Sequence, residues 1–170
     1  MSKQLTNEYV SELLTKEFGE AVLTVENPYG LLTVEISPSK IHEVISWLKS
    51  HTELAVSYLT NLGTVHYPEA KGREIAVVYH LHSLVNNLRI RLKAFLPIEN
   101  PEIKSIVDLY AGANWMERET YDFYGVNFVG HPNLKRILNV DEMDYFPLRK
   151  EYPLEDQTRI DKDDQMFGRG

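Results

Sequence analysis

The residues most able to do chemistry lie in one stretch, residues 117–138, which reads ERETYDFYGVNFVGHPNLKRIL. Two carboxylates held close together can act as general acid and base. Glu117 and Glu119 are two residues apart and point to different sides of a helix, whereas Glu119 and Asp122 share a face. No evident nucleophile accompanies that pair. A free-standing hydrolase that uses Glu119 and Asp122 is therefore the weaker interpretation.

The glycines of this stretch do not predict a phosphate-binding loop. Gly125 and Gly130 have the separation of the glycines in a Walker A motif. However, His131 and Pro132 stand where that motif needs a lysine followed by a hydroxyl residue. No Gly-x-Gly-x-x-Gly motif occurs elsewhere in the chain. We therefore interpret both glycines as turn residues.

Metal chemistry has little support in the sequence. His80 and His82 alternate onto one face of an expected strand, and His66 could lie on a neighbouring strand, as in a three-histidine zinc site. No carboxylate that could orient these rings is obvious nearby, so we expect no metal on this chain. The chain also has no cysteine, which excludes disulfides and thiolate ligation of an iron–sulfur cluster.

Two charges of the stretch oppose the dipole of a helix expected over residues 115–124. Arg118 lies near its positive N-terminus and Asp122 near its negative C-terminus, each at a cost of a few tenths to about 1 kcal/mol. Local rules broken together often mark a functional site. Two explanations are open: a partner that needs these charges, or an internal ion pair, within the helix or to Lys135, Arg136 or the sheet.

Periodicity predicts the elements that position these residues. Helices are expected over residues 5–18, 38–49, 104–111 and 115–124. The residues expected to cap or end them are Thr6, Ser37, the capping-box pairs Ser105–Asp108 and Asn114–Glu117, and the glycines Gly19, Gly112 and Gly125.

The strand predictions begin with two β-branched runs around residues 27–30, which indicate a hairpin. Runs over 56–67, 74–83 and 87–96 predict successive antiparallel strands. In the last run apolar residues alternate with Arg89, Arg91 and Lys93. This basic row could hold a carboxylate-rich partner, although such rows are more often the solvated face of a half-buried sheet.

Together these elements predict an α+β fold, with a small, mostly antiparallel sheet flanked by helices. We expect one domain over residues 1–138 and an extended, irregular C-terminal arm over 139–170, where periodicity ends. A net charge of −7 argues against binding to nucleic acid or to an anionic membrane. No apolar run approaches the roughly 20 residues of a spanning helix, so we expect membrane association only through partners.

Residues 114–138 resemble the signature of the C subunit of bacterial NADH-quinone oxidoreductase, the 30-kilodalton subunit family of respiratory complex I. The residues that match its fixed positions are Glu117, Arg118, Glu119, Asp122, Phe123, Tyr124, His131, Lys135, Ile137 and Leu138. YHLHS at 79–83, SIVDLYAGANW at 105–115 and PLRKEYP at 147–153 are similar to further landmarks, in the order of the family. Residues 61–66 depart from it, because the family often carries Ala and Asp there.

The resemblance implies a non-catalytic peripheral-arm subunit without cofactors, at the cytoplasmic face of the bacterial inner membrane. It implies packing against the quinone-site subunit, lettered D, and adjacent iron–sulfur subunits, lettered B and I. FMN, iron–sulfur clusters and quinone belong to the assembled complex, which passes electrons from NADH to quinone and translocates protons. The electron donor is not fixed, because a related membrane hydrogenase or ferredoxin-fed quinone oxidoreductase shares part of the signature.

The resemblance favours docking surfaces at residues 117–138 and from Pro147 onward, rather than a reaction centre. Arg118, Asp122 and His131 would be anchors for packing and ion pairs. The residues expected at interfaces are Glu117, Arg118, Glu119, Asp122, Phe123, Tyr124, Gly125, Gly130, His131, Pro132, Lys135, Arg136, Pro147, Leu148, Arg149, Lys150, Tyr152 and Pro153.

Overall fold

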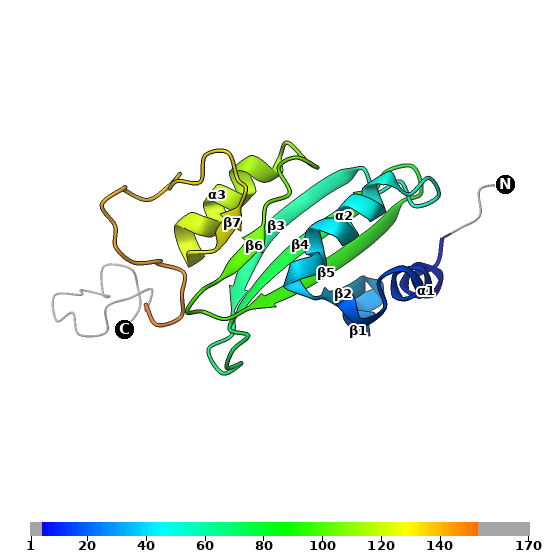
Figure 1. Cartoon of the computed structure of the whole chain (residues 1–170), viewed down its shortest axis with the longest axis horizontal. Helices are drawn as coiled ribbons and strands as arrows, with labels where there is room; N and C mark the ends of the chain where they lie inside the picture. Colours follow the sequence, from blue (N-terminus) through cyan, green and yellow to red (C-terminus); the bar gives the residue numbers. More distant parts are fainter. Residues whose placement is uncertain (1–4, 153–170) are drawn as a thin grey trace, which may run out of the picture.

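The computed structural model of the chain describes residues 5–152 and is built around one five-stranded sheet (Figure 1). Its strand order is β1-β2-β5-β4-β3. The strands are β1 Val22–Glu26, β2 Leu32–Ile36, β3 Tyr58–His66, β4 Ile75–Ser83 and β5 Leu88–Leu96. All neighbouring strands are antiparallel except β2 and β5, which are parallel. The predicted α+β fold with a mostly antiparallel sheet is confirmed.

Within residues 5–152, three α-helices and a second, two-stranded sheet complete the fold. The helices are α1 Asn7–Phe18, α2 Ile41–Ser50 and α3 Ala113–Tyr124, and the small sheet pairs β6 Glu102–Lys104 with β7 Asn127–Val129 in parallel. Short 3-10 turns lie at Gly19–Ala21, Pro28–Gly30 and Pro38–Lys40. The predicted hairpin, the three longer strands and Thr6 as the N-cap of α1 are confirmed.

Three details of the helix predictions were wrong. Residues 104–111 are not a helix, because Lys104 ends β6 and the Glu117 carboxylate binds the hydroxyl of Ser105 and the backbone N–H of Ile106. Ser37 makes no capping hydrogen bond, because the Pro38–Lys40 turn separates it from α2. Asn114 and Gly112 also change roles, because α3 begins at Ala113 and Gly112 precedes it.

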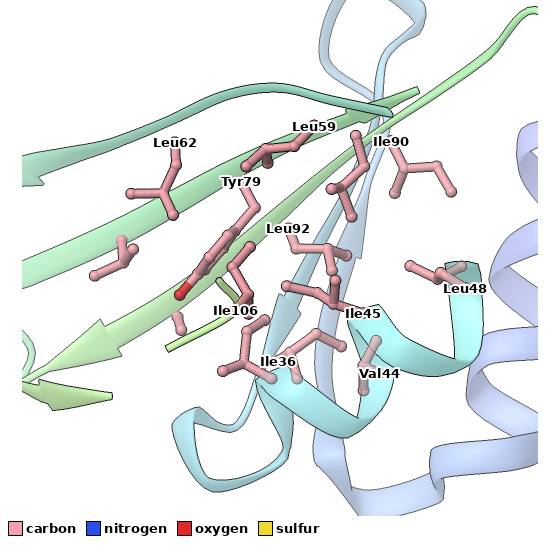
Figure 2. Packing of buried hydrophobic residues seen from close by; sticks show 14 of the residues in the cluster. Ile36, Val44, Ile45, Leu48, Leu59, Leu62, Tyr79, Ile90, Leu92 and Ile106 are labelled. Carbon is pink, nitrogen blue, oxygen red and sulfur yellow. The ribbon is translucent and has the colours of Figure 1, made fainter. Parts of the chain in front are cut away.

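The core lies between the sheet and α2, which crosses one face of it (Figure 2). Helical spacing places Ile41, Val44, Ile45 and Leu48 on the buried side of α2, as predicted. They join one buried apolar cluster with inward-facing strand residues and with the region around α3, β6 and β7. Within the part of the chain that the structure describes, no helix is long and apolar enough to cross a bilayer.

Tyr79 sits in the middle of this core, and its hydroxyl is buried without a hydrogen-bond partner among the described residues (Figure 2). Because an unpaired buried hydroxyl is destabilising, Tyr79→Phe is expected to raise the free energy of unfolding by about 1–2 kcal/mol. Tyr110→Phe is the control. Its hydroxyl donates to the Val56 carbonyl at 2.6 Å, so its removal is expected to be destabilising. Urea unfolding measures both changes, and a loss of stability in Tyr79→Phe would contradict the prediction.

Candidate functional site

The signature stretch begins on α3 and continues through β7 into an irregular C-terminal segment, residues 130–152, that runs back along α3 (Figure 1). The helix ends at Gly125, whose positive φ of 78° suits glycine and whose N–H bonds the Tyr121 carbonyl. The buried side of α3 carries Glu117, Thr120 and Asp122. Two of the signature acids are therefore internal.

Asp122 is fully buried and organises the segment that follows β7. One carboxylate oxygen pairs with Arg136 Nη1 at 2.8 Å and accepts from the Asn139 side chain at 3.0 Å. The other accepts the backbone N–H groups of Ile137, Leu138 and Asn139 at 3.0, 2.7 and 2.9 Å. Burial alone would raise the pKa of Asp122, but these hydrogen bonds and the Arg136 charge outweigh it and hold the pKa well below its ordinary value.

Two arginines of the C-terminal segment extend this arrangement. Arg136 also donates to the carbonyls of Asp122, Met143 and Tyr145 at 2.8, 2.7 and 2.9 Å. Arg149 donates to the Tyr124 carbonyl, the last of the helix, at 2.8 Å. Both guanidinium groups lie over the Phe146 ring, at 5.2 and 4.7 Å from its centre. We call Asp122, Arg136, Phe146 and Arg149 the α3 clamp.

Arg118 does not pair with Asp122. It donates instead to the carbonyls of Lys135 and Arg136, at 3.2 and 3.0 Å, and lies over the Trp115 ring. The two charges that oppose the helix dipole therefore both bind the C-terminal segment. Arg118 donates to carbonyls of that segment, and Asp122 accepts from N–H groups of that segment. Of the two explanations that the sequence left open, the internal ion pair is present, between Asp122 and Arg136.

Glu117 is the second buried acid, and it fastens α3 to the chain after β6. Its carboxylate accepts from the Ser105 hydroxyl at 2.7 Å and the Ile106 N–H at 2.8 Å. Burial raises its pKa to about 7, against the lowering effect of these hydrogen bonds. The neutral acid is therefore the form that this site accommodates best.

This raised pKa makes a prediction about stability and pH. Between the ordinary pKa near 4.5 and about 7, the folded chain holds a proton on Glu117 that the unfolded chain releases. Stability therefore falls as pH rises through this window, by up to about 3 kcal/mol. Glu117→Gln imitates the neutral acid, so its free energy of unfolding should not show this decrease with pH. The stability of the variant relative to the wild type should therefore rise between pH 5 and 8.

Urea unfolding at four pH values tests this, with Glu119→Gln as the control because Glu119 is exposed. The other titrating groups are common to all three proteins, so the difference between curves isolates Glu117. Curves for Glu117→Gln and the wild type that stay parallel from pH 5 to 8 would contradict the prediction.

The loop after β7 positions His131. Its Nδ1 accepts from the Asn133 N–H at 3.0 Å, so its Nε2 carries the hydrogen and donates to the Asn114 carbonyl at 3.1 Å. His131 thus ties this loop to the first turn of α3. Pro132 and Lys135 are exposed on the same loop.

The end of the C-terminal segment lies against the sheet. Leu148 donates its N–H to the Phe123 carbonyl at 3.2 Å, and Lys150 donates its N–H to Nδ1 of His66, at the end of β3, at 3.0 Å. Pro147 is half-buried, whereas Lys150 and Tyr152 are exposed. Pro153 and the rest of the predicted arm lie outside the described residues.

The described residues do not have the geometry that a hydrolase site or a metal site would require. Glu119 is exposed while Asp122 is buried with its oxygens fully bonded, so the two cannot flank one bond. His66 lies on the core face of the sheet, whereas His80 and His82 lie on the opposite face, so the three imidazoles do not converge. No three potential ligands gather anywhere in the described chain.

Several large apolar side chains stay exposed on α3 and the segment beyond it. Leu138 is 66% exposed and Val140 62% exposed; Leu138 supplies one of the three N–H groups that Asp122 binds, and Val140 directly follows them. The others are Trp115, Val129, Tyr145, Leu148 and Tyr152. Where exposed apolar side chains gather into a large patch, that patch often marks a protein interface.

Sequence reasoning missed Phe146, Asn139 and Ser105. Phe146 packs against Gly125 and lies under two arginines, Asn139 binds Asp122, and Ser105 binds Glu117. No local pattern marks the contacts with α3 and Gly125, because Gly125, Asp122 and Glu117 are 21, 17 and 12 residues away from Phe146, Asn139 and Ser105, respectively. The one available signal was the opposition of Arg118 and Asp122 to the dipole, which indicated external partners without naming them.

Known proteins share this sequence pattern. The model of the family "Respiratory-chain NADH dehydrogenase, 30 Kd subunit" matches residues 34–158. The C subunit of NADH-quinone oxidoreductase from Nocardioides sp. is 46% identical over 107 residues, covering 63% of this chain and 43% of that protein. The mitochondrial NADH-ubiquinone oxidoreductase 30.4 kDa subunit of Neurospora crassa is 41% identical over 130 residues, covering 76% and 45%.

Solved structures share the fold. A trypsin-resistant fragment of Nqo5 aligns with a TM-score of 0.64 at 27% identity, covering 74% of this chain and 98% of the fragment. A chain of the membrane-bound sulfane sulfur reductase, an archaeal respiratory membrane complex, aligns with a TM-score of 0.72 at 20% identity, covering 86% and 85%. The second likeness shows the fold alone.

The alignments with these curated relatives cover less than half of each relative's own length. They nevertheless agree with the family model, which includes the sheet from β2 onward, α3, the clamp and all of the signature residues. Because that match extends over well more than half of the chain, the chain belongs to the family of the 30 Kd subunit of respiratory-chain NADH dehydrogenase.

Proposed function

We propose that this chain is a peripheral-arm subunit of a proton-translocating NADH:quinone oxidoreductase, in which it docks and positions other subunits without binding a cofactor. The observation that carries the proposal is the α3 clamp. It fixes a segment without regular secondary structure so that its apolar side chains, Leu138 and Val140 foremost, face outward. Because the surface is already ordered, a partner that binds it does not incur the conformational-entropy cost of ordering it.

The proposed partners are those implied by the family: the quinone-site subunit, lettered D, and the adjacent iron–sulfur subunits, lettered B and I. The electron path from NADH through FMN and iron–sulfur clusters to quinone would lie in the other subunits. We further propose that the chain is held at the cytoplasmic face of the bacterial inner membrane through those partners. The isolated chain would not catalyse electron transfer.

The signature residues divide into two groups under this proposal. Glu117, Asp122, Arg136 and Arg149 act inside the chain, because their bonds run to its own backbone and side chains. The docking surface itself would consist of exposed neighbours such as Pro132, Lys135, Leu138 and Tyr152. Each internal residue then contributes to docking indirectly, because it stabilises the conformation of the segment that carries the surface.

The fold does not identify the electron donor. A protein with this fold occurs in the membrane-bound sulfane sulfur reductase, an archaeal respiratory membrane complex. Function resides in the sites of an assembly and not in a fold. The alternative is therefore that this chain is the equivalent subunit of a membrane hydrogenase or ferredoxin-fed quinone oxidoreductase, and an experiment must distinguish it from a subunit of an NADH:quinone oxidoreductase.

Affinity purification of the tagged full chain from gently solubilised membranes separates the two. We expect the chain to recover a flavin-bearing, NADH-oxidising subunit together with the quinone-site subunit. Deletion of the gene is expected to abolish both assembly and NADH-dependent quinone reduction. Recovery of an assembly without an NADH-oxidising partner would favour the alternative donor, and normal quinone reduction without the chain would contradict the positioning role itself.

A further inference from the structure

A cavity of about 420 Å³ lies at the end of the sheet where β3 and β5 begin and β4 ends. It is far along the strands from the C-terminal segment, which meets the sheet at His66, the other end of β3. The side chains that could bind a ligand there come from three strands. They are Tyr58 and Asn61 of β3, His80 and His82 of β4, and Arg89 of β5.

A β-bulge in β3 brings these residues together. Tyr58 pairs with His82 and Asn61 pairs with His80, so the bulged strand places one extra residue, Thr60, between the two pairs. In a regular strand, residues 58 and 61 would point to opposite faces. The bulge instead puts Tyr58 and Asn61 on the same face, beside the two histidines. Bulges that redirect a side chain in this way are frequent next to functional sites.

His80 offers a hydrogen-bond donor with no partner. Arg91 Nε–H donates to His80 Nε2 at 3.0 Å, so that nitrogen is unprotonated and Nδ1 carries the hydrogen. Burial, together with the Arg91 charge, lowers the pKa of His80, which keeps the ring neutral at neutral pH. Its Nδ1, like Nε2 of His82, is shielded from solvent and has no partner among the described residues. Such groups are costly unless something binds them.

Arg89 supplies a positive charge at the same place. It stands opposite His82 in the β4–β5 register and is exposed. Among the described residues it has no ion pair, whereas Arg73 on this side of the sheet is paired with Glu35 at 2.7 Å. None of the residues that line the cavity is acidic. In a chain of net charge −7, this is a local cationic site, with Leu31 and the Tyr58 ring as its apolar part.

We infer that this cavity binds an organic carboxylate, with Arg89 pairing with the carboxylate, the Asn61 amide as a donor, and Leu31 and Tyr58 against its apolar body. Guanidinium and carboxylate groups match in charge and geometry. The carboxylate can belong to a small free acid or to an acidic side chain of an adjoining subunit. The site is distinct from the α3 clamp and does not rest on the proposed function.

The test uses the purified full chain and 4-fluorobenzoate, observed by ¹⁹F relaxation NMR. We expect saturable binding with a Kd on the order of 1 mM, because the probe is small and the site open. Arg89→Gln is expected to weaken it about tenfold or more. Lys93→Gln is the matched control, because Lys93 lies on the same strand and face but outside the cavity. It is expected to leave the Kd within about twofold.

Three results would overturn the inference: no saturable binding, equal weakening by both variants, or displacement by inorganic phosphate as effective as displacement by benzoate, which would indicate a general anion site. Neutral 4-fluorobenzamide should not compete. Repeating the titration on the affinity-purified assembly separates the two sources. Arg89-dependent binding that persists there supports a free acid, whereas binding seen only with the isolated chain supports a carboxylate of an adjoining subunit.

Discussion

Replacement of Asp122 by alanine is expected to lower the free energy of unfolding by about 3–5 kcal/mol, the typical effect of breaking a buried ion pair by removing one partner. The change leaves the Arg136 guanidinium in the clamp without its carboxylate. It also removes the acceptor of three backbone N–H groups, at Ile137, Leu138 and Asn139. We expect the amide hydrogens of residues 137–139 to exchange faster with solvent, because each loses its bond.

The matched control is Asp108→Ala. Asp108 also binds a nitrogen-bearing side chain, that of His42, at 2.9 Å, but the Asp108 side chain is 63% exposed. Exposed pairs contribute about 0–1 kcal/mol, so the loss should be small. Urea unfolding measures both variants. Similar losses of stability would show that the buried position of Asp122 does not have the importance assigned to it.

The pH dependence gives a second readout of the same residue. Because the folded-state pKa of Asp122 lies below its ordinary value of 3.8, its contribution to stability is fully present above that value. The contribution is lost as pH falls below it. The difference in stability between wild type and Asp122→Ala should therefore be constant from pH 5 upward and shrink in more acidic solution.

Replacement of Gly125 by alanine is expected to lower the free energy of unfolding by about 2–4 kcal/mol, from two effects. Gly125 has a φ of 78°, which strains any residue with a Cβ. In addition, a Cβ there would lie 2.5 Å from the Phe146 ring. That ring is held by the two arginines of the clamp, so it cannot move aside without disturbing them.

Gly130→Ala separates the two effects. Gly130 has a φ of 88°, but nothing lies within 4 Å of the Cβ that alanine would add. It is therefore expected to show the backbone strain alone, about 1–2 kcal/mol. The excess loss in Gly125→Ala should disappear when Phe146 is also replaced by alanine. Equal losses for the two glycine variants would mean that contact with Phe146 contributes nothing.

The sequence alone predicted most of the sheet and three of the helices, because their buried residues follow the periods of two and 3.6. Leu88, Ile90 and Leu92 are buried and alternate with the more exposed Arg89 and Arg91, as expected for a strand in a sheet with one covered face. The residue order could not reveal the parallel pairing of β2 with β5, since the chain passes through α2, β3 and β4 between them.

The stretch that carries the signature could be identified in the sequence, but the contacts that its residues make within the chain were not predictable. From the local sequence, an acid such as Asp122 near the C-terminus of a helix is only an unfavourable charge, because it opposes the helix dipole. Its explanation lies in Arg136 and three N–H groups 14 to 17 residues away, in a segment with no periodicity. The same holds for the helix predicted over residues 104–111, which Glu117 prevents through contacts 11 and 12 residues distant.

We propose that the clamp presents an apolar docking surface, and one measurement tests this role directly. The full chain is tagged and purified from gently solubilised membranes as wild type, as Leu138→Glu/Val140→Glu, and as Leu84→Glu/Val85→Glu. The second pair is also exposed, Leu84 at 61% and Val85 at 82%, but lies in the turn between β4 and β5, away from the clamp. Both variants should unfold at the wild-type urea concentration, since no buried residue changes.

We expect Leu138→Glu/Val140→Glu to recover at least about tenfold less of the NADH-oxidising and quinone-site partners, because two charges would be buried in the interface. Leu84→Glu/Val85→Glu should recover them as the wild type does. Undiminished recovery by the first variant, or equal loss by both, would contradict the assignment of the docking surface to the clamped segment.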